Sequence, residues 1–381
     1  MSGELVLTNA RIVLADEIVQ GTVSVRSGRI DAVDASRTAI PSAVDLEGGT
    51  LIPGLIELHT DNIERHLMPR PKADWPSEAA VMSHDREVVA SGITTVCNAL
   101  AVGAVNTHAI RETMLLEICR TVDGLDDSGA LKADHFLHLR CEVSYPSLPG
   151  LIEPVIDHPA IRIISVMDHT PGQRQFADIG EYASFYKGRF GLNDAELERF
   201  MKERQADQIR YSATNRSKVV ELGSARGISL ASHDDATEDH VDEAISDGIV
   251  IAEFPTTKAA AKKSHENGLA VLMGGPNMVR GRSHNGNISA RDLAEAGTLD
   301  ILSSDYIPAS LLYAALVMER SVDDIALPQA IATVTRNPAR QISLDDRGEI
   351  AVGKRADLVH FRETGGVPVI QNVWREGRLV A

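Results

Sequence analysis

Short apolar runs alternate with longer stretches of helical pattern through the middle of the chain. The runs are rich in Val and Ile, and such strands, each followed by a helix, predict parallel β-α units. Eight runs have this character, at residues 55–58, 93–100, 136–141, 161–167, 228–231, 249–254, 269–273 and 301–303. Eight units are the number that closes a (β/α)8 barrel of about 250 residues.

An open, doubly wound sheet is the competing α/β architecture. It would usually carry a G-x-G-x-x-G turn after its first strand, and no such turn follows residues 55–58. We therefore expect an α/β fold with a distorted, TIM-like (β/α)8 barrel.

Both ends of the chain have a different pattern, with short strands separated by turn residues. Near the start, Leu5-Val6-Leu7 and Ile12-Val13-Leu14 flank Asn9-Ala10, and near the end a similar pattern covers residues 356–380. We expect residues 1–50 and 346–381 to form one composite β-sandwich domain. Residues 51–345 would then form the barrel. The charged segment 177–227 predicts a solvated pair of helices outside it.

Composition limits the possible functions. The 381 residues are 43% hydrophobic but 4% aromatic, and this balance suits packed α/β layers. A net charge of -16 argues against general binding to nucleic acid or to a membrane surface. An anionic substrate would need local Arg and Lys residues.

Cysteine usage and the N-terminal sequence bear on the compartment. Cys97, Cys119 and Cys141 form no C-x-x-C pair, so we expect neither a disulfide framework nor a thiolate zinc site. This pattern fits a reducing cytoplasm. Glu4 interrupts the N-terminus early, and no run of about 18 apolar residues exists, so we expect neither a signal peptide nor a transmembrane helix.

Polar and charged side chains end most of the eight runs. In a barrel these carboxyl ends meet at one face, where active sites lie. His59 and Asp61 follow the first run two residues apart, so they lie on one face of an extended chain. The predicted metal ligands are His59, Asp61, Glu142, His169, His233 and Asp305.

These ligands predict a hard or borderline divalent ion. Nitrogen and oxygen donors without thiolate fit Zn²⁺ or Mn²⁺, and Glu142 could bridge two such ions. Asp305 is the candidate catalytic base, taking the proton from the attacking water. Because strand ends predicted from sequence are uncertain by a few residues, Asp168 could replace His169, and His138 could replace Glu142.

These patterns resemble the amidohydrolase superfamily over nearly the whole chain. Residues 51–59 (LIPGLIELH) are similar to its first metal-binding strand, 92–96 (GITTV) to its second strand, and 348–359 (GEIAVGKRADLV) to its closing signature. Three positions depart from it. Asp61 stands where most members have the second His of His-x-His, the bridging lysine of the fourth strand has no counterpart, and Glu253 replaces a His on the sixth.

Longer blocks resemble one family within it, the diphosphatases of alkylphosphonate breakdown through the carbon–phosphorus lyase pathway. The blocks are 59–62 (HTDN), 69–76 (PRPKADWP), 83–85 (SHD), 137–142 (LHLRCE), 167–176 (MDHTPGQRQF), 231–237 (ASHDDAT) and 302–306 (LSSDY). The resemblance implies hydrolysis of α-D-ribose 1-methylphosphonate 5-triphosphate to the 5-phosphate and diphosphate. Two alternatives stay open, an amide or cyclic-amide hydrolase and a non-catalytic scaffold barrel.

A triphosphate requires cationic contacts in an acidic protein. Guanidinium groups match phosphate geometry with paired donors. The predicted substrate-binding residues lie on loops after the first, fourth and seventh runs: Arg70, Lys72, Arg174, Asn277, Arg280 and His284. We expect a small-molecule substrate, no nucleic-acid or membrane partner, and a homo-oligomer.

Overall fold

The computed structural model describes residues 4–70, 73–103, 110–174, 193–283 and 286–381, with the backbone alone for 110–113. The chain divides into two compact units. The first comprises Met1–Asn98, Thr121–Phe136 and Met273–Ala381, and the second comprises Ala99–Arg120 and Leu137–Leu272.

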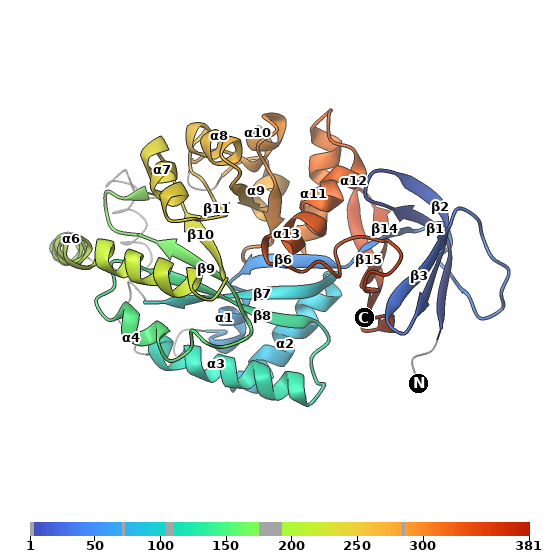
Figure 1. The fold of residues 1–381 in the computed structure, drawn as a ribbon, viewed down its shortest axis with the longest axis horizontal. Helices are drawn as coiled ribbons and strands as arrows, with labels where there is room; N and C mark the ends of the chain where they lie inside the picture. Colours follow the sequence, from blue (N-terminus) through green and yellow to red (C-terminus); the bar gives the residue numbers. More distant parts are fainter. Residues whose placement is uncertain (1–3, 71–72, 104–109, 175–192, 284–285) are drawn as a thin grey trace. The chain divides into compact units, whose positions relative to one another are not determined.

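Eight strands form a parallel sheet in strict chain order. They are β6 (Leu55–Thr60), β7 (Ile93–Val102), β8 (Asp134–Glu142), β9 (Ile161–Met167), β10 (Ser229–His233), β11 (Ile251–Glu253), β12 (Ala270–Gly274) and β13 (Ile301–Ser303). Figure 1 labels β6 to β11 among them. Each predicted run is a strand of this sheet, which confirms the α/β barrel. The strands are buried over most of their length because helices cover parallel sheets.

The order closes within the first unit. Thr60, at the end of β6, makes a parallel bridge with Asp305, just after β13. The Thr60 hydroxyl donates to the Asp305 carbonyl oxygen at 2.6 Å, and the Asp305 N–H donates to the His59 carbonyl oxygen at 3.2 Å. The first and last barrel strands are therefore joined at their carboxyl ends, and the sheet forms a nearly closed barrel.

Helices follow most barrel strands. They are α1 (Asn62–Leu67), α2 (Ser77–Ala90), α3 (Ile110–Asp127), α4 (Leu148–Ile152), α6 (Asp194–Ser224), α7 (Glu238–Ser246), α8 (Lys258–Glu266), α9 (Gly275–Arg280), α10 (Ala290–Glu295), α11 (Ser310–Ser321), α12 (Leu327–Ala332) and α13 (Arg336–Gln341). Across the described residues, no helix is both long and apolar enough to cross a membrane.

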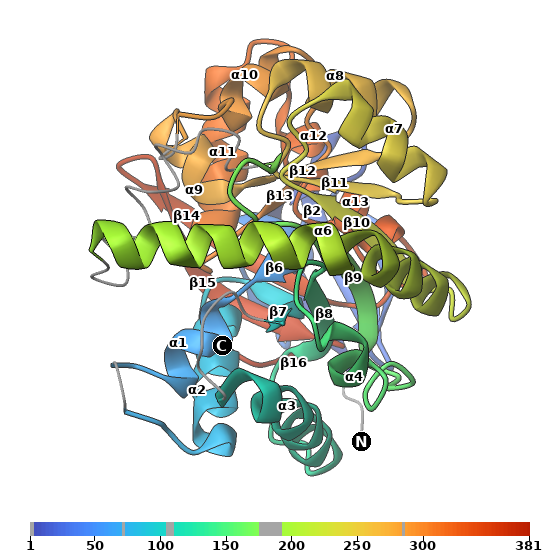
Figure 2. The same ribbon diagram turned by 90° about the vertical axis from the view of Figure 1, so that its left-hand side faces the viewer.

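The described part of the charged segment contains one long helix, α6. α6 runs unbroken for 31 residues (Figure 2). It begins with a reciprocal capping box, in which the Asn193 side chain accepts from the Glu196 N–H and the Glu196 carboxylate accepts from the Asn193 N–H. The predicted pair of helices also included residues 177–192, all of which lie outside the described residues.

Both ends of the chain meet in a second sheet of the first unit. Its strands are β1 (Leu5–Val13), β2 (Ile18–Arg26), β3 (Arg29–Asp34), β4 (Val44–Asp45), β5 (Thr50–Pro53), β14 (Leu358–Thr364), β15 (Val367–Arg375) and β16 (Arg378–Leu379). They form one hydrogen-bonded path, β16-β15-β14-β5-β1-β2-β3, with β4 paired to β1.

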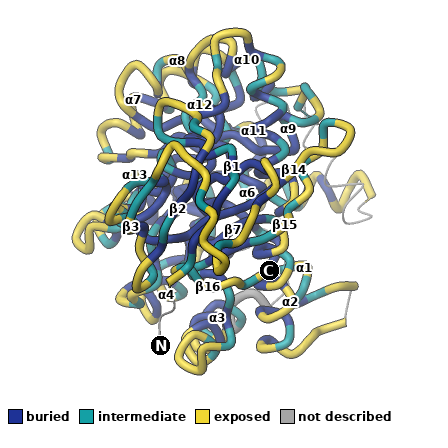
Figure 3. The backbone as a smooth tube through the Cα atoms, turned by 90° about the vertical axis from the view of Figure 1, so that its right-hand side faces the viewer, coloured by how far each residue is buried: buried dark blue, intermediate teal, exposed yellow. Residues whose placement is uncertain are grey.

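This terminal sheet is mixed, because β1 pairs with β4 and β5 in parallel and its other pairs are antiparallel. β1 is buried or half-buried along its whole length (Figure 3). The two ends of the chain thus form one β-structure, as predicted, and β5 is part of its strand path.

The Asp134 carboxylate forms ion pairs with three guanidinium groups in the first unit. Asp134 forms ion pairs with Arg347 and Arg375 and, at 2.6 Å, with Arg355 Nη1. Burial alone would raise the pKa of Asp134, but these guanidinium charges hold it below its usual range. The start of β8 is thereby tied to the segment that leads into β14 and to β15.

Replacing Asp134 with Asn should lower the free energy of unfolding by about 3–5 kcal/mol, because partly buried guanidinium groups lose their counterion. Urea unfolding at neutral pH measures this change. A group whose pKa is depressed on folding stabilises above its unfolded pKa, so the difference should shrink as the pH falls below about 4. The matched control is Asp157→Asn, which breaks the exposed pair with Arg226 and should change little. Equal effects of the two variants would contradict the role of Asp134.

Candidate metal centre

The first element of the centre is a carboxylate–imidazole pair in the second unit. Glu142 is the last residue of β8, and His169 follows β9, its parallel neighbour. The Glu142 Oε2 atom lies 2.8 Å from His169 Nδ1. Its Oε1 atom accepts from the His169 N–H at 3.1 Å and from the Ser144 hydroxyl at 2.8 Å. Both carboxylate oxygens are thus used in holding the ring and its backbone.

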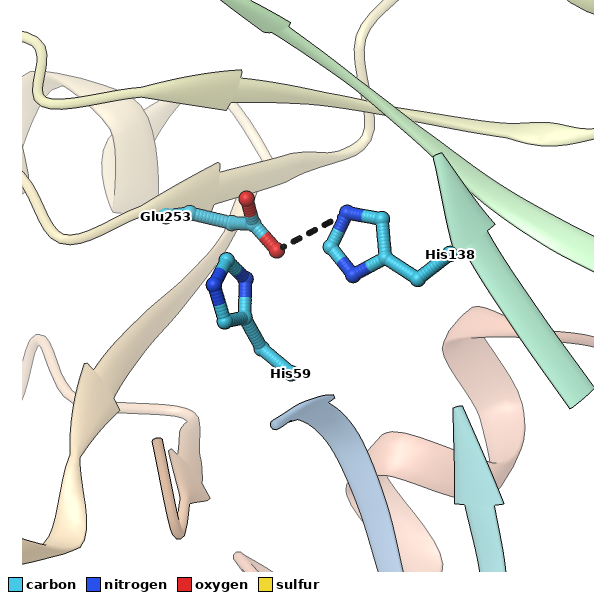
Figure 4. A group of neighbouring side chains, drawn as sticks. All are labelled: His59, His138 and Glu253. Atoms are coloured by element: carbon cyan, nitrogen blue, oxygen red, sulfur yellow. Dashed lines mark ion pairs between the residues drawn. The ribbon is translucent and has the colours of Figure 1, made fainter. Parts of the chain in front are cut away.

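A second pair repeats this arrangement on the next two strands. His233 ends β10 and Glu253 ends β11, in direct parallel register. His233 Nδ1 lies 3.2 Å from Glu253 Oε2, which also accepts from the Ser165 hydroxyl at 2.6 Å. On the other side of Glu253, His138 Nε2 lies 3.7 Å from Oε1 (Figure 4, which also labels His59). His138 also contacts the Ser165 hydroxyl through Nε2.

The free nitrogens of the two rings converge on Asp234. His169 Nε2 lies 3.7 Å from Asp234 Oδ2, and His233 Nε2 lies 3.5 Å from the same oxygen. The ligand atoms of the three residues all lie within 4.8 Å of one another. The Oδ2 atom is buried and has no hydrogen-bond partner among the described residues. A buried carboxylate oxygen without a donor is costly unless a cation satisfies it.

Burial and neighbouring charges set the protonation of these groups. Burial lowers the pKa of His233 to about 3, so this ring is neutral and offers a lone pair. Burial also acts to lower the pKa of His169, but its bond to the Glu142 carboxylate raises the pKa above the usual value. Burial raises the pKa of Asp234 to about 6. A metal ion held by these atoms would require both Nε2 atoms and the Asp234 carboxylate to be unprotonated, so its binding would compete with protons.

The donor set fits a divalent ion. Ligand histidines in metal sites usually give their second ring nitrogen to a carboxylate, which fixes the tautomer and ring direction. His169 and His233 both have this support, and Asp234 adds an oxygen donor. Two imidazoles and one carboxylate suit Zn²⁺ or a similar ion.

The remaining predicted ligands belong to the first unit. His59 is buried near the end of β6, and its N–H donates to the buried Glu57 carboxylate at 2.6 Å. Burial raises the pKa of Glu57 to about 7. Asp61 is half-buried and precedes α1, where its side chain makes no capping bond. Asp305 is half-buried, with a left-handed backbone at φ 56°.

The structure separates the two alternatives for the fourth strand. The Asp168 carboxylate accepts from the Thr170 N–H at 3.1 Å and from Ser212 and Gln208 of α6 at 3.1 and 3.3 Å. It is therefore bound to the helix, whereas His169 faces the cluster. His138 contacts Glu253 and Ser165, whereas Glu142 contacts His169, so the two side chains belong to different carboxylate–imidazole pairs.

The predicted substrate contacts have mixed placements. Arg174 is buried and ion-paired with Asp235 and, at 2.8 Å, with Glu243 of α7, so protein carboxylates already occupy its guanidinium. Asn277 Oδ1 accepts from the Ala290 N–H at 2.9 Å. Arg70 and Arg280 are exposed. Lys72 and His284 lie outside the described residues.

Sequence reasoning did not include Asp234 among the candidate ligands and did not pair Glu253 with His233. Asp234 directly follows a strand-ending His and has φ 57°, a left-handed conformation that Asp adopts more readily than most residues. The two acids that directly follow His233 in the sequence Ser-His-Asp-Asp are the signal that could have identified Asp234. Nothing in the sequence pairs Glu253 with His233, because that contact depends on the register of β10 and β11.

Comparison with known proteins identifies relatives along the whole chain. Residues 192–381 match the amidohydrolase family. The chain is 46% identical to the α-D-ribose 1-methylphosphonate 5-triphosphate diphosphatase of Escherichia coli (strain K12), over 99% of this chain and 100% of that protein. An adenine deaminase of Desulfatibacillum aliphaticivorans is 24% identical over 97% of this chain and 58% of its own length.

Solved structures share the fold at low sequence identity. A 5-methylcytosine deaminase from Klebsiella pneumoniae superposes with a TM-score of 0.68 at 15% identity, covering 99% of this chain and 98% of its own. N-isopropylammelide isopropylaminohydrolase from Burkholderia multivorans gives 0.66 at 17% identity, covering 100% and 98%. These likenesses concern the architecture.

The variant His233→Asn should lose its bound metal, because it removes one of the three converging donor atoms. Metal content after dialysis, measured by inductively coupled plasma mass spectrometry, tests this expectation. His158→Asn, which changes a half-buried His away from the strand ends, is the control and should keep its metal. Full metal content in His233→Asn would remove this residue from the ligand set.

Proposed function

We propose, since the chain belongs to the amidohydrolase family of metal-dependent hydrolases, that it hydrolyses α-D-ribose 1-methylphosphonate 5-triphosphate. The products would be the 5-phosphate and diphosphate. The observation that carries this proposal is the end-to-end likeness to a diphosphatase that is named for this substrate. The convergence of two carboxylate-backed imidazoles on an unsatisfied carboxylate supports it, because such a centre suits hydrolysis by an activated water.

His169, His233 and Asp234 would hold a divalent ion, zinc or manganese. When bound, this ion would supply Lewis acidity and lower the pKa of a water. We propose a second ion with His59, Asp61 and Asp305 among the ligands, because the carboxyl ends of barrel strands meet at one face. Glu142 is better assigned as the residue that orients His169, since both of its oxygens hold that residue.

Asp305 remains the proposed proton acceptor. Its backbone is fixed by the bonds to His59 and Thr60, so its carboxylate would have a defined position at the end of the last strand. A carboxylate held in this way can take the proton from the attacking water and pass it to the leaving diphosphate. Cyclic-amide hydrolysis uses the same kind of base, so the substrate must be decided by the groups that bind anions.

Arg70 and Arg280 are the proposed contacts to the triphosphate among the described residues. Both are exposed, and no described carboxylate is paired with either, so their donors are available to a ligand. Lys72 and His284 stay in the proposal from the sequence. Arg174 is withdrawn as a direct phosphate contact because Asp235 and Glu243 occupy it.

Phosphorus NMR of the metal-loaded protein with the triphosphate tests the reaction directly. Diphosphate and a 5-phosphate product should appear together, stop on addition of a chelator, and return when metal is restored. Absence of turnover with metal bound would overturn the proposal and favour an amide substrate. Absence of both turnover and metal would favour a non-catalytic barrel.

The variant Arg280→Ala should raise the KM for the triphosphate by about tenfold, because one charge-assisted contact is lost. Its metal content should match that of the unaltered protein. Lys262→Ala, which removes an exposed cation paired with Glu266 on α8, is the control for the change in net charge. Parallel losses of metal and of substrate affinity in Arg280→Ala would contradict the assigned role.

A further inference from the structure

Arg140 lies on β8 between two residues of the metal-centre network. Alternate residues of a strand point to one face, so Arg140 shares its face with His138 and Glu142. Its register partner on β9 is Ser165. His138, Ser165 and Glu142 all contact the carboxylate–imidazole pairs described above. The side chain of Arg140 therefore projects from the strand face that carries these pairs, at a level between them.

Arg140 forms no ion pair with any carboxylate among the described residues. Among the described residues, its guanidinium makes neither a hydrogen bond nor an ion pair, and its Nε atom is buried without an acceptor. Three other arginines of the second unit, Arg174, Arg216 and Arg226, are all paired with carboxylates. A partly buried guanidinium that lacks a partner raises the free energy of the folded protein. A bound anion would offset this desolvation cost.

The positive charge acts on each group of the centre. Burial has the largest effect on the pKa values of His169, His233 and Asp234, and the charge of Arg140 adds a downward shift to all three. Arg140 therefore lies within electrostatic reach of these side chains. A divalent ion held by them would be repelled by the same guanidinium. An anion that contacts both cations would relieve this repulsion.

We infer that Arg140 binds a tetrahedral phosphorus oxyanion of the substrate next to the candidate metal centre and so determines selectivity for anionic substrates. This inference rests on the proposed function. A guanidinium presents paired donors that match two oxygens of one phosphoryl or phosphonate group. A neutral amide offers no such group and would leave Arg140 without a counterion, so the same residue disfavours amide substrates.

Isothermal titration of metal-loaded Arg140→Met and Arg140→Lys with inorganic phosphate, and separately with methylphosphonate, tests the inference. Arg140→Met should bind the better of the two anions about 100-fold more weakly than the unaltered protein, because paired charge-assisted bonds are lost. Arg140→Lys, which keeps the charge without the paired donors, should lose about tenfold. The anion that loses more affinity identifies the end of the substrate that Arg140 contacts.

Metal content and a surface variant provide the controls. Arg226→Met removes a guanidinium of the second unit that pairs with exposed Asp157, and it should bind both anions normally. Arg140→Met should retain its metal and show a raised KM for the triphosphate. Unchanged anion affinity in Arg140→Met, or loss of metal from both Arg140 variants, would overturn the inference. The lysine variant keeps the test valid if the methionine variant fails to fold.

The inference and the proposed function fail separately. Turnover of the triphosphate by the unaltered protein, with unchanged anion binding in both Arg140 variants, would reject the role of Arg140 and leave the reaction standing. No turnover by the unaltered protein, with weakened anion binding in the Arg140 variants, would reject the reaction and support the anion site.

Discussion

The candidate centre depends on one constraint, a buried carboxylate behind each imidazole. Glu142 and Glu253 each take the Nδ1 side of a ring, and this leaves both Nε2 atoms directed at Asp234. Strand pairing makes these contacts possible. Glu142 ends β8 beside β9, which His169 follows, and Glu253 ends β11 beside β10, which His233 ends. The apolar interior of the parallel sheet fixes those strand ends, so the packing of the barrel also sets the direction of the donors.

This constraint also accounts for what the sequence could and could not predict. All eight barrel strands were predictable, because strands that are buried on both faces appear as short, mostly apolar runs. The positions of His169 and His233 followed from the ends of those runs. The contacts of Glu142 did not follow, because a sequence shows that an acid stands at a strand end but not which atoms it contacts. Its two oxygens hold His169, where the sequence had suggested a bridge between ions.

Two arginine residues show a second limit of prediction from sequence, because a sequence does not reveal which guanidinium groups are paired with carboxylates. Arg174 and Arg140 are both basic residues near strand ends, and the sequence favoured Arg174 as a phosphate contact. The carboxylates that neutralise Arg174 come from Asp235 after β10 and from Glu243 on α7, more than 60 residues away in the chain. A guanidinium that lacks such partners can be recognised only when the neighbouring strands and helices are in place. The strand order of the terminal sheet could not be predicted for a similar reason, since strand pairing is not local.

The pairing of β5 with β14 has a consequence for how the chain is made. Pro53 pairs with Leu358, and Thr50 pairs with Phe361, across about 300 residues. During synthesis, β1 to β5 leave the ribosome long before β14 has been made. The edge of β5 that pairs with β14 therefore stays without those hydrogen bonds in the meantime. Contacts of such long sequence separation form slowly and leave strand edges open to wrong partners. Production of this protein is therefore most vulnerable in the interval before β14 emerges, when its first fifty residues can pair with another nascent chain.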